Sequence, residues 1–135
     1  MTIYHLHGDD AGETHLTPIE TIVYDSEAAG ESFGSSKRVR VGPTFAAYDL
    51  GFAECIDPLQ DSGLHVATRR QLLAIMKGQY EIITTSGDQV VLQPGDLLFP
   101  DDVDSKGHWS KEVVGSEPLT MVSVGIPDDW ELPKS

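Results

Sequence analysis

Short apolar runs separated by turn residues make up most of the chain from Thr44 onward. The runs are rich in Val, Ile, Phe and Tyr, and Gly, Pro, Asp and Ser separate them at short, regular spacing. This pattern is typical of an all-β barrel or sandwich, and no segment combines helical apolar spacing with a suitable cap. Strands are expected near Thr44–Ile56, Gln71–Met76, Gln79–Thr85, Gln89–Leu92, Asp96–Phe99, His108–Val114 and Leu119–Ile126.

The residues between these runs predict tight turns. Lys77-Gly78 favours a hairpin because glycine adopts positive φ without strain, and Ser86-Gly87-Asp88 predicts the next hairpin. Gln93-Pro94-Gly95-Asp96 fits a type II turn, with proline at its second position and glycine at its third. Turns this short predict that consecutive strands pair as a meander.

The first forty-odd residues have a different texture. Gly30, Gly34, Ser35 and Ser36 interrupt them, and only the stretch from Thr21 to Tyr24 is strand-like. His5, His7 and His15 lie in this region at irregular spacing, which favours exposed side chains over a metal-binding tract. We therefore expect an irregular N-terminal arm with edge strands over residues 1–43, a barrel over 44–127 and a C-terminal tail over 128–135.

Charge and cysteine content indicate which partners and which cellular compartment to expect. The chain has 135 residues and a formal net charge of −13, with 22 acidic residues against 9 basic ones. Such a charge opposes binding to nucleic acid or to an anionic membrane surface, so neither is an expected partner. Cys55 is the only cysteine, and the N-terminal residues lack the features of a signal peptide. These features predict a cytoplasmic domain in which Cys55 is a buried, inert thiol.

Two stretches carry candidate chemistry. His65 and Gln71 flank a short connection, and if that connection is a turn, both side chains can converge inside a barrel. His108 follows an acidic loop at the point where the chain turns back. Arg69 and Arg70 are unusual in so acidic a chain; either could bind a carboxylate or phosphate of a ligand, or form a structural ion pair.

These stretches resemble the two motifs of the cupin superfamily. The first motif runs Gly, five residues, His-x-His, three or four residues, Glu, six residues, Gly. His65, Gln71 and Gly78 have its spacing, whereas Ala67 replaces the second His, Gln71 replaces Glu and Leu59 replaces the opening Gly.

The second motif runs Gly, five residues, Pro-x-Gly, two residues, His, three residues, Asn. Gly95 matches its start and His108 its His, while Pro100 stands one place early, Glu112 replaces Asn and the loop is longer. The resemblance covers about residues 44–127. It implies a cupin-type double-stranded β-helix, also called a jelly-roll barrel, with a ligand pocket around His65, Gln71 and His108.

Cupins of this architecture often hold a metal on three His and one carboxylate. By resemblance, His65, Gln71 and His108 would be the ligands of a divalent iron, manganese, nickel or zinc ion. The set lacks an anionic ligand, which Glu54 or Glu112 could supply. Metal-assisted oxidation would follow from such a site.

A metal-free site would instead use His65 and His108 as catalytic acid and base in an isomerisation or elimination. Arg69, Gln71 and Tyr48 are the candidate ligand-binding residues. A non-catalytic module that binds or senses a small molecule in the same pocket is the alternative, and a purely structural barrel is a third hypothesis. We also expect a homodimer in which the N-terminal arm covers an edge strand of the partner.

Overall fold

The chain consists of β-strands, turns and loops wherever the computed structural model describes it, which is over residues 2–20, 24–25, 40–41, 44–57, 63–115 and 117–132. No helix in these residues is long and apolar enough to cross a membrane. The strands are β1 Thr2–Gly8, β2 Thr14–Glu20, β3 Tyr24–Asp25, β4 Arg40–Val41, β5 Tyr48–Glu54, β6 Gln71–Lys77, β7 Tyr80–Thr84, β8 Gln89–Leu92, β9 Leu97–Asp101, β10 His108–Glu112 and β11 Thr120–Gly125.

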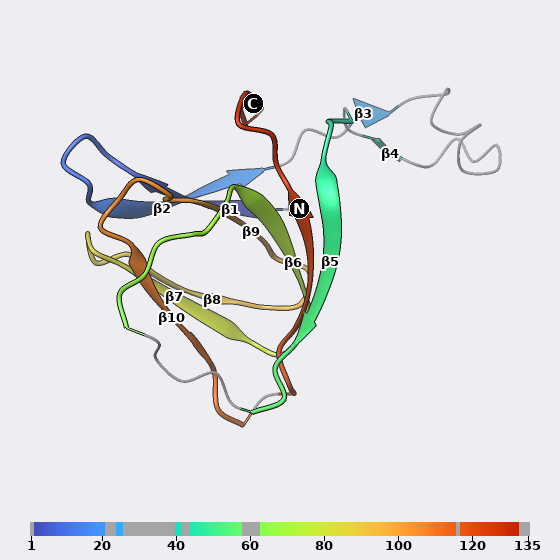
Figure 1. Ribbon diagram of the computed structural model, residues 1–135. Helices are drawn as coiled ribbons and strands as arrows, with labels where there is room; N and C mark the ends of the chain where they lie inside the picture. The colour runs from blue at the N-terminus through green and yellow to red at the C-terminus, as the bar shows by residue number, and fades with distance from the viewer. Residues whose placement is uncertain are drawn as a thin grey trace.

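Two sheets face each other across the main core (Figure 1). The large sheet has six strands in the order β2-β1-β9-β6-β11-β5, and the small sheet has three in the order β10-β7-β8. β3 and β4 pair separately as a short antiparallel ribbon. The all-β class expected from the sequence is therefore confirmed.

The two sheets do not close into a barrel within the described residues. On one side they are linked through Thr14, whose N–H donates to the Thr85 hydroxyl at 2.8 Å. On another side a single antiparallel bridge joins His65 to His108. The closed barrel expected from the sequence is thus not observed, because isolated contacts stand where a continuous hydrogen-bond ladder would be needed.

The strands expected from Thr44 onward are present, but their pairing is not a meander. Only β7 and β8 form a hairpin between consecutive strands of that region. The turn at Gly78 carries the chain from the large sheet to the small one, and the turn at Gly95 carries it back. Gly78 has a φ of 77° and a Cβ there would stand 2.6 Å from the Glu117 carbonyl oxygen, so no other residue fits this crossing without a shift.

The N-terminal region contains more regular structure than an irregular arm. β1 and β2 form an antiparallel hairpin along their full length. β2 is an edge strand that lies before the stretch expected to be strand-like, whereas β1 lies inside the large sheet and pairs in parallel with β9. The strand-like stretch from Thr21 lies largely outside the described residues.

Alternating side chains place one core on each face of the large sheet. Leu6, Ile75 and Leu98 point toward the small sheet and pack there with Ile82 and Leu92. The opposite face carries a second cluster, whose buried members are Ile3, Phe99 and Ile126. Trp130 and Leu132, beyond the last strand, pack on this second cluster, so the C-terminal segment covers part of the outer face.

Candidate functional site

A row of polar side chains runs along the inner face of β10. His108, Ser110 and Glu112 alternate with Trp109 and Lys111, and side chains at every second position of a strand share one face. His108 and Ser110 are 5% and 3% exposed. Buried polar groups need hydrogen-bond partners, so this row indicates a polar network inside the molecule as well as apolar packing.

His108 is fixed by a buried carboxylate. Its Nδ1 lies 2.6 Å from Oδ2 of Asp102, and the Asp102 side chain is completely buried. A carboxylate accepts, so Nδ1–H donates to it and the lone pair of the neutral ring is left on Nε2. Among the residues described, Nε2 of His108 has no hydrogen-bond partner. The second Asp102 oxygen accepts a longer bond, 3.3 Å, from the Ala67 N–H.

His65 lies beside His108 from a different part of the chain. The two backbones exchange hydrogen bonds of 3.0 and 2.8 Å, and the two rings are 4.4 Å apart between centroids. Nδ1 of His65 lies 2.9 Å from the Gly63 carbonyl oxygen, which can only accept, so this ring also carries its proton on Nδ1. Its Nε2 faces the Ser110 hydroxyl at 3.4 Å.

Glycine at position 107 permits this close approach. Gly107 has a φ of 94°, which side chains rarely adopt, and a Cβ there would stand 2.7 Å from the carbonyl carbon of His65. The glycine before His108 thus has a steric role: it lets the His65 segment pair with the start of β10.

Tyr80 extends the polar network into the core. It lies opposite Glu112 in the β7–β10 pair. Burial raises the pKa of the Tyr80 phenol, and a hydrogen bond with Ser110 partly opposes that rise. The phenol therefore stays protonated at neutral pH. Asp102, His108, His65, Ser110 and Tyr80 together line one side of the interior with groups that donate and accept protons.

The predicted ligand-binding residues gather around Gly125 rather than around the histidines. Gln71 and Tyr48 pair with Gly125 from the strands on either side, and the Tyr48 ring occupies the space where a Gly125 side chain would lie. The Arg69 guanidinium lies 5.5 Å from the centre of the Tyr48 ring, and it contacts Asp49 at 3.5 Å. No hydrogen bond among the described residues joins Gln71 to His65 or His108.

The interior is open on the side of β5. Ala53 and Gly51 share the inward-facing register with Met121 and Ser123, yet Ala53 is exposed and Gly51 is half-buried. On the same face but farther from the β5 edge, Leu6 on β1 and Leu98 on β9 are fully buried. Small residues on β5 therefore leave this half of the interior accessible to solvent.

Arg70 has a structural role, unlike its neighbour Arg69. Its guanidinium donates to Asp101 at 2.8 Å and to the carbonyl oxygens of Pro127 and Trp130 at 2.6 and 2.7 Å. Burial opposes ionisation of Asp101, but hydrogen bonds from His5 and Arg70 outweigh it and hold its pKa below the usual value. Of the two readings left open for Arg70, the structure favours the ion pair.

The N-terminal histidines form a half-buried row on the outer face of the β1–β2 hairpin. The rings of His5 and His7 stack 4.7 Å apart, and His15 follows at 5.7 Å from His7. His5 contacts Asp101 and His15 contacts Asp9, at 2.9 and 2.8 Å. The expectation of simply exposed side chains is therefore wrong, because the alternation of β1 stacks His5 and His7 on one face.

The donor set does not fit a metal ion. No group of three or more His, Cys, Asp or Glu side chains in the described ranges is placed to hold one. At the predicted site, Asp102 holds Nδ1 of His108, and no described carboxylate joins His65 and His108 as a third donor. Two imidazoles without a carboxylate in ligating position are a weak set.

Sequence reasoning missed Asp102, Ser110 and Tyr80. Asp102 is one of several acids in a single loop, and nothing local separates the buried one from its exposed neighbour Asp104. Ser110 could have been found as the residue two places after His108 on the same strand face.

A scan of protein-family models and a search of curated proteins found no match to this chain.

Proposed function

We propose that this chain is a cupin-type jelly-roll domain that binds a small molecule at the open side of its interior and catalyses proton transfer on it. The proposal rests most heavily on the pair formed by His108 and Asp102, with its 2.6 Å contact. Support for the fold comes from the two facing sheets and from the turns at Gly78 and Gly95 that pass the chain between them.

The roles follow from the hydrogen bonds. His108 would act as general base through Nε2, because Asp102 holds its proton on Nδ1 and stabilises the imidazolium that forms. His65 would return a proton to the substrate from Nε2 when its ring is an imidazolium, because the Nδ1 proton is held by the Gly63 carbonyl oxygen; Ser110 would keep the ring in place. Isomerisation and elimination need this combination of a base and an acid near one carbon centre.

Arg69 would bind a carboxylate of the substrate. Its side chain is 31% exposed, and its contact with the exposed Asp49 is long, so a ligand anion can compete for it. Tyr48 and Gln71 would position the rest of the molecule beside Gly125.

Exchange of substrate hydrogen with solvent tests this proposal. Small α-keto, α-hydroxy and α-amino carboxylates would be incubated with the protein in deuterium oxide and followed by proton NMR. We expect exchange at the α-carbon of at least one, and a loss of about 10²-fold or more in Asp102→Asn and His108→Gln. Nitrogen NMR of the histidine rings should show Nδ1–H for His108 in the wild type.

Two results would contradict it. An equal rate of hydrogen exchange in the wild type and in Asp102→Asn would contradict the role of His108 as the general base. Binding of a carboxylate without exchange, retained in His108→Ala, would favour the non-catalytic binding module instead. Arg69→Gln serves as a matched variant, because it should weaken binding while leaving the ring protonation of His108 unchanged.

A homodimer in the cytoplasm is part of the proposal. β5 is an edge strand whose Leu50 and Phe52 side chains are 63% and 78% exposed. Exposed apolar edges of this kind favour pairing with another chain. Measurement of mass in solution at micromolar concentration tests the dimer, and a monomeric mass would contradict it.

A further inference from the structure

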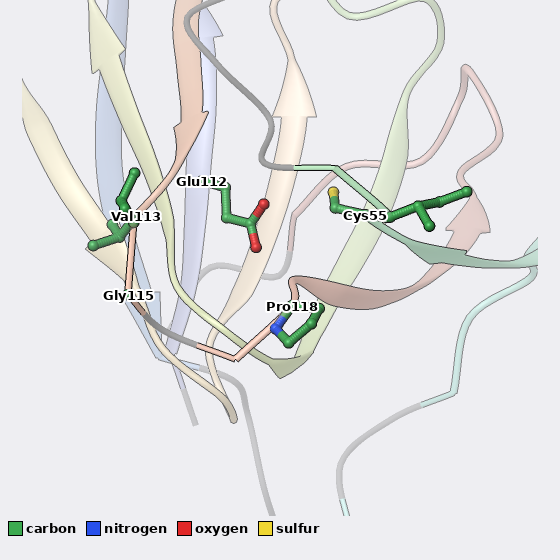
Figure 2. Close-up of a pocket in the computed structure, with 7 residues that line it drawn as sticks. Cys55, Glu112, Val113, Gly115 and Pro118 are labelled. Carbon is green, nitrogen blue, oxygen red and sulfur yellow. The ribbon is translucent and has the colours of Figure 1, made fainter.

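A cavity of about 210 Å³ opens at the end of β10 farthest from His108. Figure 2 shows the Glu112 carboxylate pointing from β10 toward the strand end that carries Cys55. β10 has five residues from His108 to Glu112, so at about 3.3 Å per residue the two ends lie about 13 Å apart. Among the described residues, the cavity is lined by Cys55, Ile56, Glu112, Val113, Val114, Gly115 and Pro118.

The described part of the lining is apolar, with one acidic group and no basic one. Glu112 is held in place by the Leu119 N–H, which donates to its Oε1 at 3.0 Å. Ile56 and Val114 are almost fully exposed at the cavity mouth. Burial and the Glu112 charge together raise the pKa of the Cys55 thiol, so at neutral pH Cys55 is uncharged, and Glu112 is the one acidic side chain among the described residues of the lining.

We propose that this cavity binds a small organic ammonium ion. Its positive end would lie at Glu112, and its short hydrocarbon part would pack against Ile56, Val113 and Pro118. The volume equals about seven water molecules at about 30 Å³ each, which limits the ligand to a handful of heavy atoms. An anion would be repelled by Glu112 and by the net charge of −13.

The reaction rate of Cys55 reports on the cavity, because Cys55 is the only cysteine in the chain and reagents for thiols therefore label this position alone. Two methanethiosulfonates would be compared, one carrying a trimethylammonioethyl group and the other a sulfonatoethyl group. In each case the Cys55 thiolate attacks the reagent sulfur, a mixed disulfide forms and methanesulfinate leaves. The ratio of the two rates at one pH cancels the thiol pKa and reports the local potential.

We expect the cation-to-anion rate ratio of Cys55 to exceed that of a neutral cysteine peptide by about tenfold, the effect of one charge at close range. Glu112→Gln should bring the ratio down to near the peptide value, since glutamine can still accept from Leu119. Glu54→Gln is the matched control, because Glu54 is exposed and does not line the cavity. In about 1 M salt, charges farther than about 3 Å away are largely screened. Rates measured there separate the effect of the nearby Glu112 charge from the effect of the net charge of the protein.

Reversible binding is tested by protection. Millimolar butylammonium should slow the reaction of Cys55 with the neutral reagent iodoacetamide. Millimolar affinity is expected because so small a ligand makes few contacts. Butanol and butyrate, of nearly the same size, should protect much less. Equal protection by butanol, or a rate ratio that Glu112→Gln leaves unchanged, would overturn the proposal. Neither result bears on His108, so this site and the proton-transfer site fail separately.

Discussion

The backbones of Gly107 and His65 are in such close contact that residue 107 has no room for a side chain: a Cβ there would stand 3.2 Å from the His65 nitrogen and 2.7 Å from its carbonyl carbon. This contact holds His65 and His108 side by side. It follows that the geometry of the candidate site depends on a residue that offers no functional group of its own.

Gly107→Ala should therefore separate the two histidines. Positive φ for a residue with a side chain costs on the order of 1–3 kcal/mol, and the overlap with His65 adds to it. The free energy of unfolding measured in urea reports the sum. Gly87→Ala is the control, because Gly87 has a similar φ of 97° with nothing within 4 Å. Equal losses in the two variants would show that the His65 contact contributes nothing.

Replacing Arg70 by lysine should release the C-terminal segment from the large sheet. Lysine cannot reproduce the three bonds that the guanidinium makes to Asp101, Pro127 and Trp130. We expect a loss of about 1.5–3 kcal/mol in unfolding free energy, together with a red shift of Trp fluorescence.

Arg69→Lys is the matched control for that experiment. Its contact with Asp49 is 3.5 Å long and exposed, so the loss should stay within about 0.5 kcal/mol. Similar losses for the two arginines would contradict the structural role assigned to Arg70.

The histidine row should make stability fall in mild acid. Burial, followed by the charges of His5 and His15, lowers the pKa of His7 below its ordinary value of 6.5. Between these two pKa values the unfolded chain binds a proton that the folded chain does not. The contribution of His7 is thus intact above pH 6.5 and is lost as pH falls through the folded pKa.

His7→Gln should flatten the acid side of the stability profile. Glutamine can keep a hydrogen bond to Thr17, which lies 2.9 Å from Nε2 of His7, without acquiring a charge. Unfolding in urea from about pH 8 to pH 5 measures the slope for both proteins. The same slope in the variant and the wild type would exclude His7 as its origin.

The sequence predicted the strands well because turns are local. Gly78, Gly87 and Gly95 all adopt positive φ where turns were expected, and the strands between them begin and end within a few residues of the expected bounds. The sheet that each strand joins was not predictable in this way. Pairing depends on contacts between segments far apart in sequence, and the same tight turn at Gly78 serves a hairpin or a crossing between sheets.

The candidate site likewise has a part that could be predicted from local sequence and a part that depends on the fold. His65 and His108 were selected by spacing, and the fold brings them together. Asp102 could not be singled out, because its burial depends on how the loop folds over the start of β10. The hairpin of β1 was missed because histidines at positions 5 and 7 break the apolar alternation of one face.

The position of β1 in the large sheet has a consequence for how the chain assembles. Ile3 pairs with Leu97, so the sheet is complete only when the start of the described chain meets a segment far along the sequence. Until then β9 presents an unpaired edge that carries the apolar residues Leu98 and Phe99. A variant that lacks β1 would expose this edge even when folded. We expect such a variant to associate with other copies before any decrease in its melting temperature is seen.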